Sequence, residues 1–227
     1  PDIISTDEDA ENAAKVLRNQ WNLGYDPIPD VVEMLEDKGY KVIEVETSKD
    51  FDGMKSETDG KKVIVLRKDN NGDVVRKRFT ALHELAHHSL IFQEDMAEKQ
   101  KEKLCHAFAS AVLYPEEMAR KELNRERFHF YQKELEMIKE RWGISFPAIF
   151  NRALKLGVIG EYVYTNLNIE YRSRGLHQNE PARFLSREKP VKFERLIYFA
   201  LGKELISVND AAFYSGKSVW EFREQLQ

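Results

Sequence analysis

The chain has 227 residues, of which 42% are hydrophobic and 33% charged, with a formal net charge of −4. This length is sufficient for one sizeable core, or for one core and a small satellite unit. The charges are mixed in sign, so the composition gives no general attraction to nucleic acid or membrane. Any contact with DNA would need a local basic face.

The compartment can be inferred from three further features. The single cysteine, Cys105, excludes an internal disulfide framework and is typical of a reducing compartment. No apolar run approaches the roughly 18–20 residues of a membrane-spanning helix. The start of the chain is acidic and polar, unlike a secretory signal. We therefore expect a soluble cytoplasmic protein that has no contact with a membrane.

The first half of the chain alternates between helix and strand signals. Apolar residues three and four apart indicate helices, and strict alternation indicates half-buried strands. Asp30 is a suitable capping residue for the second helix. The predicted elements are helices over 8–22 and 30–38, strands over 40–45 and 63–66, a turn at 69–73, a helix from about Thr80, and a helix over 96–113.

The second half is expected to be mainly helical from about residue 116. Gly143 suits a left-handed turn and Ser145 a helix cap, which predicts a helix, a tight turn and a second helix. Further along we expect a strand over 162–167, an extended loop or linker over 168–190, and a small helical unit over 193–227.

The most specific motif is His83-Glu84-Leu85-Ala86-His87, which matches the pattern HExxH. Two histidines four residues apart project from the same face of a helix, so both imidazoles can bind one Zn²⁺. Glu84 lies to the side, where its carboxylate can take a proton from a metal-activated water that attacks a carbonyl. The alternative is that these are ordinary surface or core histidines of an amphipathic helix.

A third metal ligand should come from another part of the chain. A catalytic zinc usually takes three protein ligands and leaves one position open, and the residues that follow His87 lack the Gly-x-x-His pattern that would supply a third histidine close by. Glu98 and Glu102 lie toward the apolar face of the next predicted helix, where a carboxylate is costly unless it is paired or binds a metal. Periodicity alone leaves the choice between them open.

Two segments resemble the ImmA/IrrE family of metallopeptidases. Arg78–His87 resembles the phenylalanine-led HExxH segment of that family, and Glu102–Pro115 is similar to its third-ligand helix. The resemblance extends over about residues 10–160 and is weak in the last 35 residues. It implies the metal ligands His83, His87 and Glu102, with Glu84 as the catalytic base.

The resemblance also implies a fold and an activity. The fold would be α+β: a mainly helical zincin-like domain with a small β-sheet over 1–125, a helix-turn-helix-like segment over 126–160, and a C-terminal strand, loop and small helical unit over 161–227. The activity would be that of a zinc-dependent endopeptidase. Its protein substrate would be a helix-turn-helix-type repressor, cut to switch on a stress, prophage or mobile-element programme. Two histidines and one carboxylate also suit Mn²⁺ or another divalent ion.

Several residues near the motif have alternative interpretations. Cys105 and His106 stand where the family more often has alanine and Asn or Asp. His106 could contact a metal-binding residue without binding the metal itself, or it could be an alternative ligand. Cys105 suits a small buried hydrophobe better than a thiolate ligand. His88 follows the motif but points off the metal face. His129 and Tyr131 could donate to a developing oxyanion, with packing as the simpler alternative.

A competing function is a metal-containing regulator that binds DNA or protein without proteolysis. The predicted helix over 146–156 carries Arg152 and Lys155 and no acidic residue, so it could approach phosphates. The helix after Ser218 has two acidic residues against one arginine, which is a poor electrostatic match to DNA. Packing within the chain is the simpler alternative for both.

Overall fold

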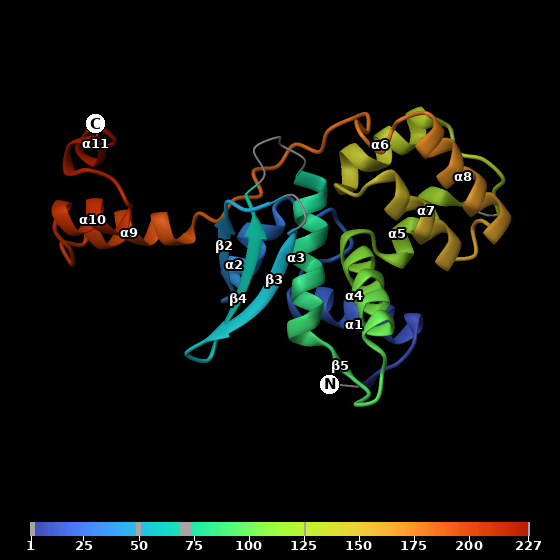
Figure 1. Ribbon diagram of the computed structural model, residues 1–227, viewed down its shortest axis with the longest axis horizontal. Helices are drawn as coiled ribbons and strands as arrows, with labels where there is room; N and C mark the ends of the chain where they lie inside the picture. The colour runs from blue at the N-terminus through green and yellow to red at the C-terminus, as the bar shows by residue number, and fades with distance from the viewer. Residues whose placement is uncertain (1–2, 49–50, 69–73, 125, 227) are drawn as a thin grey trace.

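The computed structural model describes residues 3–48, 51–68, 74–124 and 126–226. Within these ranges, helices predominate and surround small sheets, so the predicted α+β class is confirmed (Figure 1). The predicted turn at 69–73 lies outside the described residues. In the described part of the chain, no helix has both the length and the apolar character needed to cross a bilayer.

Strands and helices alternate in the first half of the chain, and the elements in the described part of the second half are helices. The strands are β1 (Ile3–Ile4), β2 (Lys41–Val45), β3 (Gly53–Thr58), β4 (Lys61–Arg67) and β5 (Ile91–Phe92). The helices of the first half are α1 (Asp7–Gln20), α2 (Val31–Asp37), α3 (Val74–Ser89) and α4 (Glu98–Leu113). The later helices are α5 (Glu116–Leu123), α6 (Gln132–Trp142), α7 (Phe146–Lys155), α8 (Glu161–Ser173), α9 (Lys192–Gly202), α10 (Val208–Tyr214) and α11 (Val219–Glu224).

The three-stranded sheet has the order β2-β4-β3, so β3 is an edge strand. β2 runs parallel to β4, and β3 pairs antiparallel to β4 with Gly53 opposite Leu66. β3 and β4 form a hairpin whose two-residue turn is Asp59-Gly60, both with positive φ, as the tightest hairpin turns require. Ile64 and Leu66 of β4 are buried in the main core, and α3 packs against both β3 and β4.

The main core lies between the sheet, α1, α3 and α4. Leu82 and Leu85 of α3 and Leu104 and Phe108 of α4 are at most 1% exposed, and they belong to one continuous cluster. Figure 1 shows α3 and α4 side by side, with the sheet beyond α3. The helix that carries the HExxH motif is therefore held on two sides by packed elements.

Two smaller cores lie outside this one. Helices α5 to α8 pack around Trp142, Phe146, Ile149 and Phe150. Helices α9 to α11 form a unit at the C-terminal end of the described chain, with only four residues buried in its core. Those four residues are Ile197, Ala211, Ala212 and Phe222.

A non-helical strap, residues 176–191, runs from α8 back across α2 and the start of α3 to reach α9 (Figure 1). Near its C-terminal end, the Glu188 side chain is fully buried and accepts hydrogen bonds from Arg78 and from the backbone N–H groups of Val31 and Val32, each at 3.0 Å from Oε2. Burial raises the pKa of Glu188, and the charge of Arg78 opposes that shift. A buried carboxylate thus attaches the strap to the base of the motif helix.

Most of the predicted helices are present, but the structure differs from the predictions in several places. α3 begins at Val74, six residues before Thr80, because Val75 and Arg78 are buried in that first part. β3 lies between the two predicted strands, where no element was predicted, because this edge strand exposes most of its side chains. The predicted strand over 162–167 is wrong: those residues belong to α8. The apolar residues of α8 have helical spacing and pack in the second core. They are Val163, Tyr164, Leu167 and Tyr171.

The Arg78–Glu188 pair supports a prediction about stability. Glu188→Ala leaves a buried guanidinium without its counter-charge, so we expect the free energy of unfolding to fall by about 3–5 kcal/mol. Urea denaturation followed by circular dichroism measures this. Glu140→Ala, which removes an exposed glutamate in α6, should change the free energy by less than about 0.5 kcal/mol. A loss as small as that of the control would contradict the role assigned to the pair.

Candidate metal centre

Helix α3 places the two histidines of the motif on one face, one turn apart. Their Nε2 atoms are 3.2 Å apart, and their side chains are only 12% and 15% exposed. The carboxylate of Glu102, from α4, lies against both rings: Oε2 is 3.0 Å from Nε2 of His83, and Oε1 is 3.0 Å from Nε2 of His87. Three groups that commonly bind metals therefore converge from two helices.

The spacing of these atoms fits a small divalent cation. Tetrahedral zinc with bonds of about 2.0–2.1 Å to its ligands would hold neighbouring ligand atoms about 3.3 Å apart. The three separations given above are close to that value. Burial, and next the nearby His106, lower the pKa of His83 to about 4. A neutral imidazole with a free lone pair is the form that binds a metal.

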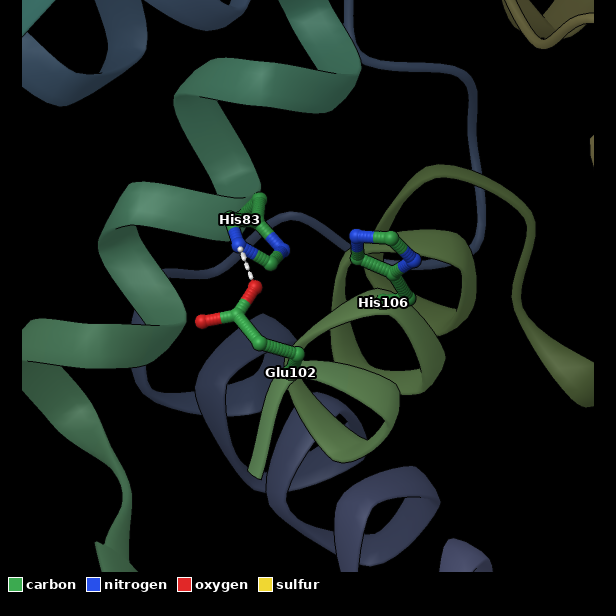
Figure 2. A group of neighbouring side chains, drawn as sticks. All are labelled: His83, Glu102 and His106. Carbon is green, nitrogen blue, oxygen red and sulfur yellow. Dashed lines mark ion pairs between the residues drawn. The ribbon is translucent and has the colours of Figure 1, made fainter. Parts of the chain in front are cut away.

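His106 is the fourth group at the centre. One potential ligand atom from each of His83, Glu102 and His106 lies within 4.8 Å of the others. Figure 2 shows the ring of His106 beside that of His83, with the drawn ion pair joining His83 to Glu102. The tighter triangle therefore contains His87, and His106 stands beside it.

The other candidates for ligands are less well placed. Glu98 lies at the start of α4, one turn before Glu102, but its side chain is 74% exposed and its carboxylate lies 3.6 Å from the amine of Lys101. Cys105 is fully buried, with its sulfur 3.7 Å from Nδ1 of His87. Burial, above all, raises the pKa of its thiol to about 12, so the thiol keeps its proton, as expected of a buried hydrophobe.

Glu84 lies beside the triangle and is largely buried. Burial raises the pKa of its carboxyl, and a hydrogen bond from the backbone N–H of Lys55 lowers it in part. Lys55 belongs to the edge strand β3, and its side-chain amine donates to the carbonyl of His87 at 3.0 Å. The edge strand therefore contacts both the middle and the end of the motif helix.

Gly53 explains how β3 comes so close to α3. A Cβ atom at this position would lie 2.6 Å from Cγ2 of Thr80 and 3.4 Å from Cγ of Glu84. Sequence reasoning missed this contribution because β3 itself was missed. The Asp59-Gly60 pair, between segments of similar length, is a hairpin signal that could have revealed the strand.

These groups line one open cleft of ≈ 820 Å³. Its polar floor consists of the two histidines, Glu84 and Glu102, and its walls include Phe79 and Phe92. Three cationic side chains also reach it: Lys55, Arg76 and Lys101.

The remaining histidines and the tyrosine lie elsewhere. His88 is bonded through Nε2 to the carbonyl of Val63 at 3.1 Å and packs against Tyr40, as expected for a residue off the metal face. His129 and Tyr131 are exposed, pack edge to face with ring centroids 5.0 Å apart, and do not line the cleft. Their geometry supports no contact with a reacting group.

The basic residues of α7 are occupied within the chain. Arg152 is 2% exposed, forms an ion pair with Glu11 and donates to the carbonyl of Tyr114 at 2.8 Å. The amine of Lys155 lies 2.9 Å from Asp7. Both acidic partners belong to α1, so these cations hold α7 against the first core instead of facing a phosphate backbone.

Comparison with known proteins agrees with this geometry. A search of curated proteins finds no match. A scan against protein families matches residues 35–154, just over half of the chain, to a peptidase family described as the IrrE N-terminal-like domain. The matched region includes both histidines, Glu84 and Glu102, and it confirms the resemblance seen in the sequence. The chain therefore belongs to peptidase family M78, the IrrE N-terminal-like family.

Proposed function

We propose that the protein is a zinc-dependent endopeptidase in which His83, His87 and Glu102 bind the metal and Glu84 is the general base. The observation that carries this proposal is the triangle of ligand atoms, with sides of 3.0–3.2 Å, beside a buried carboxylate and an open cleft. A bound Zn²⁺ would supply Lewis-acid chemistry at this point. Mn²⁺ or another divalent ion would suit the same ligands.

Glu84 takes the proton of the attacking water and returns it to the leaving amine. Burial raises the pKa of its carboxyl, which makes the carboxylate a stronger base than an exposed glutamate. The backbone N–H of Lys55 opposes this rise in pKa, so the edge strand lies next to the carboxylate. The neighbouring histidines bind the metal. Glu84 is the one carboxylate on α3, and it is therefore the group of this helix that can move protons.

The substrate would be a protein segment that enters the cleft in an extended form. The resemblance to the ImmA/IrrE family favours a repressor of the helix-turn-helix class, cleaved in the cytoplasm to switch on a stress, prophage or mobile-element programme. A regulator that acts by binding DNA is less well supported, because Arg152 and Lys155 are both paired with acids of α1.

The ligand assignment can be tested by metal content. We expect the purified protein to hold one equivalent of zinc, and His87→Ala and Glu102→Ala to hold less than about half an equivalent, since two remaining ligands bind weakly. Elemental analysis after purification without chelators measures this. Glu98→Ala is the control and should bind zinc like the unmodified chain. Full zinc in Glu102→Ala would remove that residue from the ligand set.

The role of Glu84 can be tested by comparing cleavage and metal binding. Glu84→Gln should keep its zinc but cleave a candidate repressor at least about 100-fold more slowly, because general base catalysis is lost. Electrophoresis of timed digests measures the rate. Equal cleavage by both proteins would refute the assignment. If neither cleaves any partner, and the protein instead retards DNA in a gel, the regulator is the correct function.

Gly53→Ala tests the contact between the edge strand and the motif helix. The added methyl group displaces β3 from Thr80 and Glu84, so we expect cleavage to slow by about 10- to 100-fold while zinc content is unchanged. Gly202→Ala, at the end of α9 where a Cβ meets nothing within 4 Å, is the matched control. Cleavage at the normal rate by Gly53→Ala would show that this close approach does not matter.

A further inference from the structure

We propose that Cys105 and His106, consecutive residues of α4, orient the two metal-binding imidazoles without binding the metal themselves. In this arrangement, His106 accepts the Nδ1–H of His83, and Cys105 accepts the Nδ1–H of His87. The inference rests on the proposed function, because it takes Nε2 of each histidine as the atom that faces the metal.

The positions of the Nε2 atoms determine where the ring protons must lie. Both Nε2 atoms point into the triangle with Glu102, so each must present a lone pair there when a cation is bound. A neutral imidazole has one N–H, which then lies on Nδ1. Metal-binding histidines generally donate this N–H to a neighbouring acceptor, and that bond sets the tautomer and the ring orientation.

For His87 the acceptor is already in contact. The sulfur of Cys105 lies 3.7 Å from Nδ1 of His87, and Cys105 is fully buried. Its lone pairs can accept the ring N–H, although sulfur is a weak acceptor. Cys105 therefore meets the metal centre at the outer side of a ligand, where it cannot itself bind the same ion.

For His83 the acceptor stands close by. Nδ1 of His83 is buried and has no hydrogen-bond partner among the described residues. The ring of His106 lies beside that of His83, with ring centroids 4.6 Å apart (Figure 2). Phe79 packs edge-on against His106, with ring centroids 5.6 Å apart. A rotation of the His106 ring that brings one of its nitrogens to Nδ1 of His83 would satisfy this buried atom.

The positions of these residues along α4 explain how one helix can supply both a metal ligand and the two hydrogen-bond acceptors. Glu102, Cys105 and His106 are three and four residues apart, so they share a face of the helix. One turn of α4 thus supplies a ligand for the metal and an acceptor for each histidine. Both acceptors are neutral, so each forms a weaker hydrogen bond with the ring N–H than a carboxylate would.

The test is the metal affinity of the full chain. Competition with a chromophoric chelator gives the affinity for Zn²⁺, and the absorption spectrum of the Co²⁺-loaded protein reports the number and type of ligands. His106→Phe keeps an aromatic ring against Phe79 but has no acceptor, and we expect it to bind Zn²⁺ about 10- to 100-fold more weakly with an unchanged ligand number. His106→Asn should recover most of the affinity, because its amide oxygen can accept the N–H.

Two further variants complete the comparison. Cys105→Val fills the same space without a sulfur acceptor, and we expect a smaller loss of less than about tenfold. His129→Phe, which removes an exposed histidine far from the cleft in sequence and outside its lining, should bind Zn²⁺ normally. Thermal unfolding of each metal-free variant shows whether the fold is intact; if His106→Phe does not fold, the pair His106→Leu and His106→Asn makes the same comparison.

Three results would overturn the inference, and they are distinguishable. Normal affinity in His106→Phe, or in His106→Leu, would show that the ring is not an acceptor. A Co²⁺ spectrum that loses a ligand in His106→Phe would make His106 a direct ligand. Failure of the unmodified chain to bind any divalent metal would instead refute the proposed function itself.

Discussion

The packing of α3 against α4 is the interaction on which the rest of the structure depends. Leucines of α3 and the apolar face of α4 are fully buried against one another in the main core. This contact brings Glu102 within 3.0 Å of both histidines, although it lies 15 residues beyond the second one in the chain. The energy that holds the three groups together comes from burial of apolar surface, which offsets the cost of placing a carboxylate and two imidazoles close together.

The opposite side of α3 is held by the sheet. Gly53 allows the edge strand to approach the helix more closely than any residue with a side chain would, and the N–H of Lys55 then reaches Glu84. An edge strand has backbone groups that no other strand uses, and here one of them contacts the carboxylate proposed as the base. The motif helix is therefore contacted by the proposed third ligand on one side and by the edge strand on the other.

The strap extends this arrangement to the C-terminal part of the chain. Glu188 is buried against Arg78, five residues before the first histidine of the motif, and Glu36 accepts hydrogen bonds from the backbone N–H groups of Val191 and Lys192 at 2.9 and 3.0 Å. The same chain segment is thus attached to α3 and to α2 before it enters α9. A position in the last fifth of the sequence contributes directly to the surroundings of the motif helix.

The sequence by itself determined the local part of this picture. Helical spacing is enough to place His83, Glu84 and His87 on one turn, and caps such as Asp30 and Ser145 mark where helices begin. Periodicity could not decide between Glu98 and Glu102, since both lie near the start of the same helix. The predicted strand over 162–167 failed because a short apolar segment has no clear period until its packing partners are known.

Only the tertiary structure decided the contacts between distant segments. It brings Glu102 to the histidines, Lys55 to Glu84, and Glu188 to Arg78, and each of these depends on how two elements pack and not on the spacing within either one. It also places Arg152 and Lys155 against the acids of α1, which agrees with packing within the chain, the simpler of the two interpretations of their sequence pattern. Local sequence specifies which groups share a face, whereas burial of that face against a particular partner determines what those groups meet.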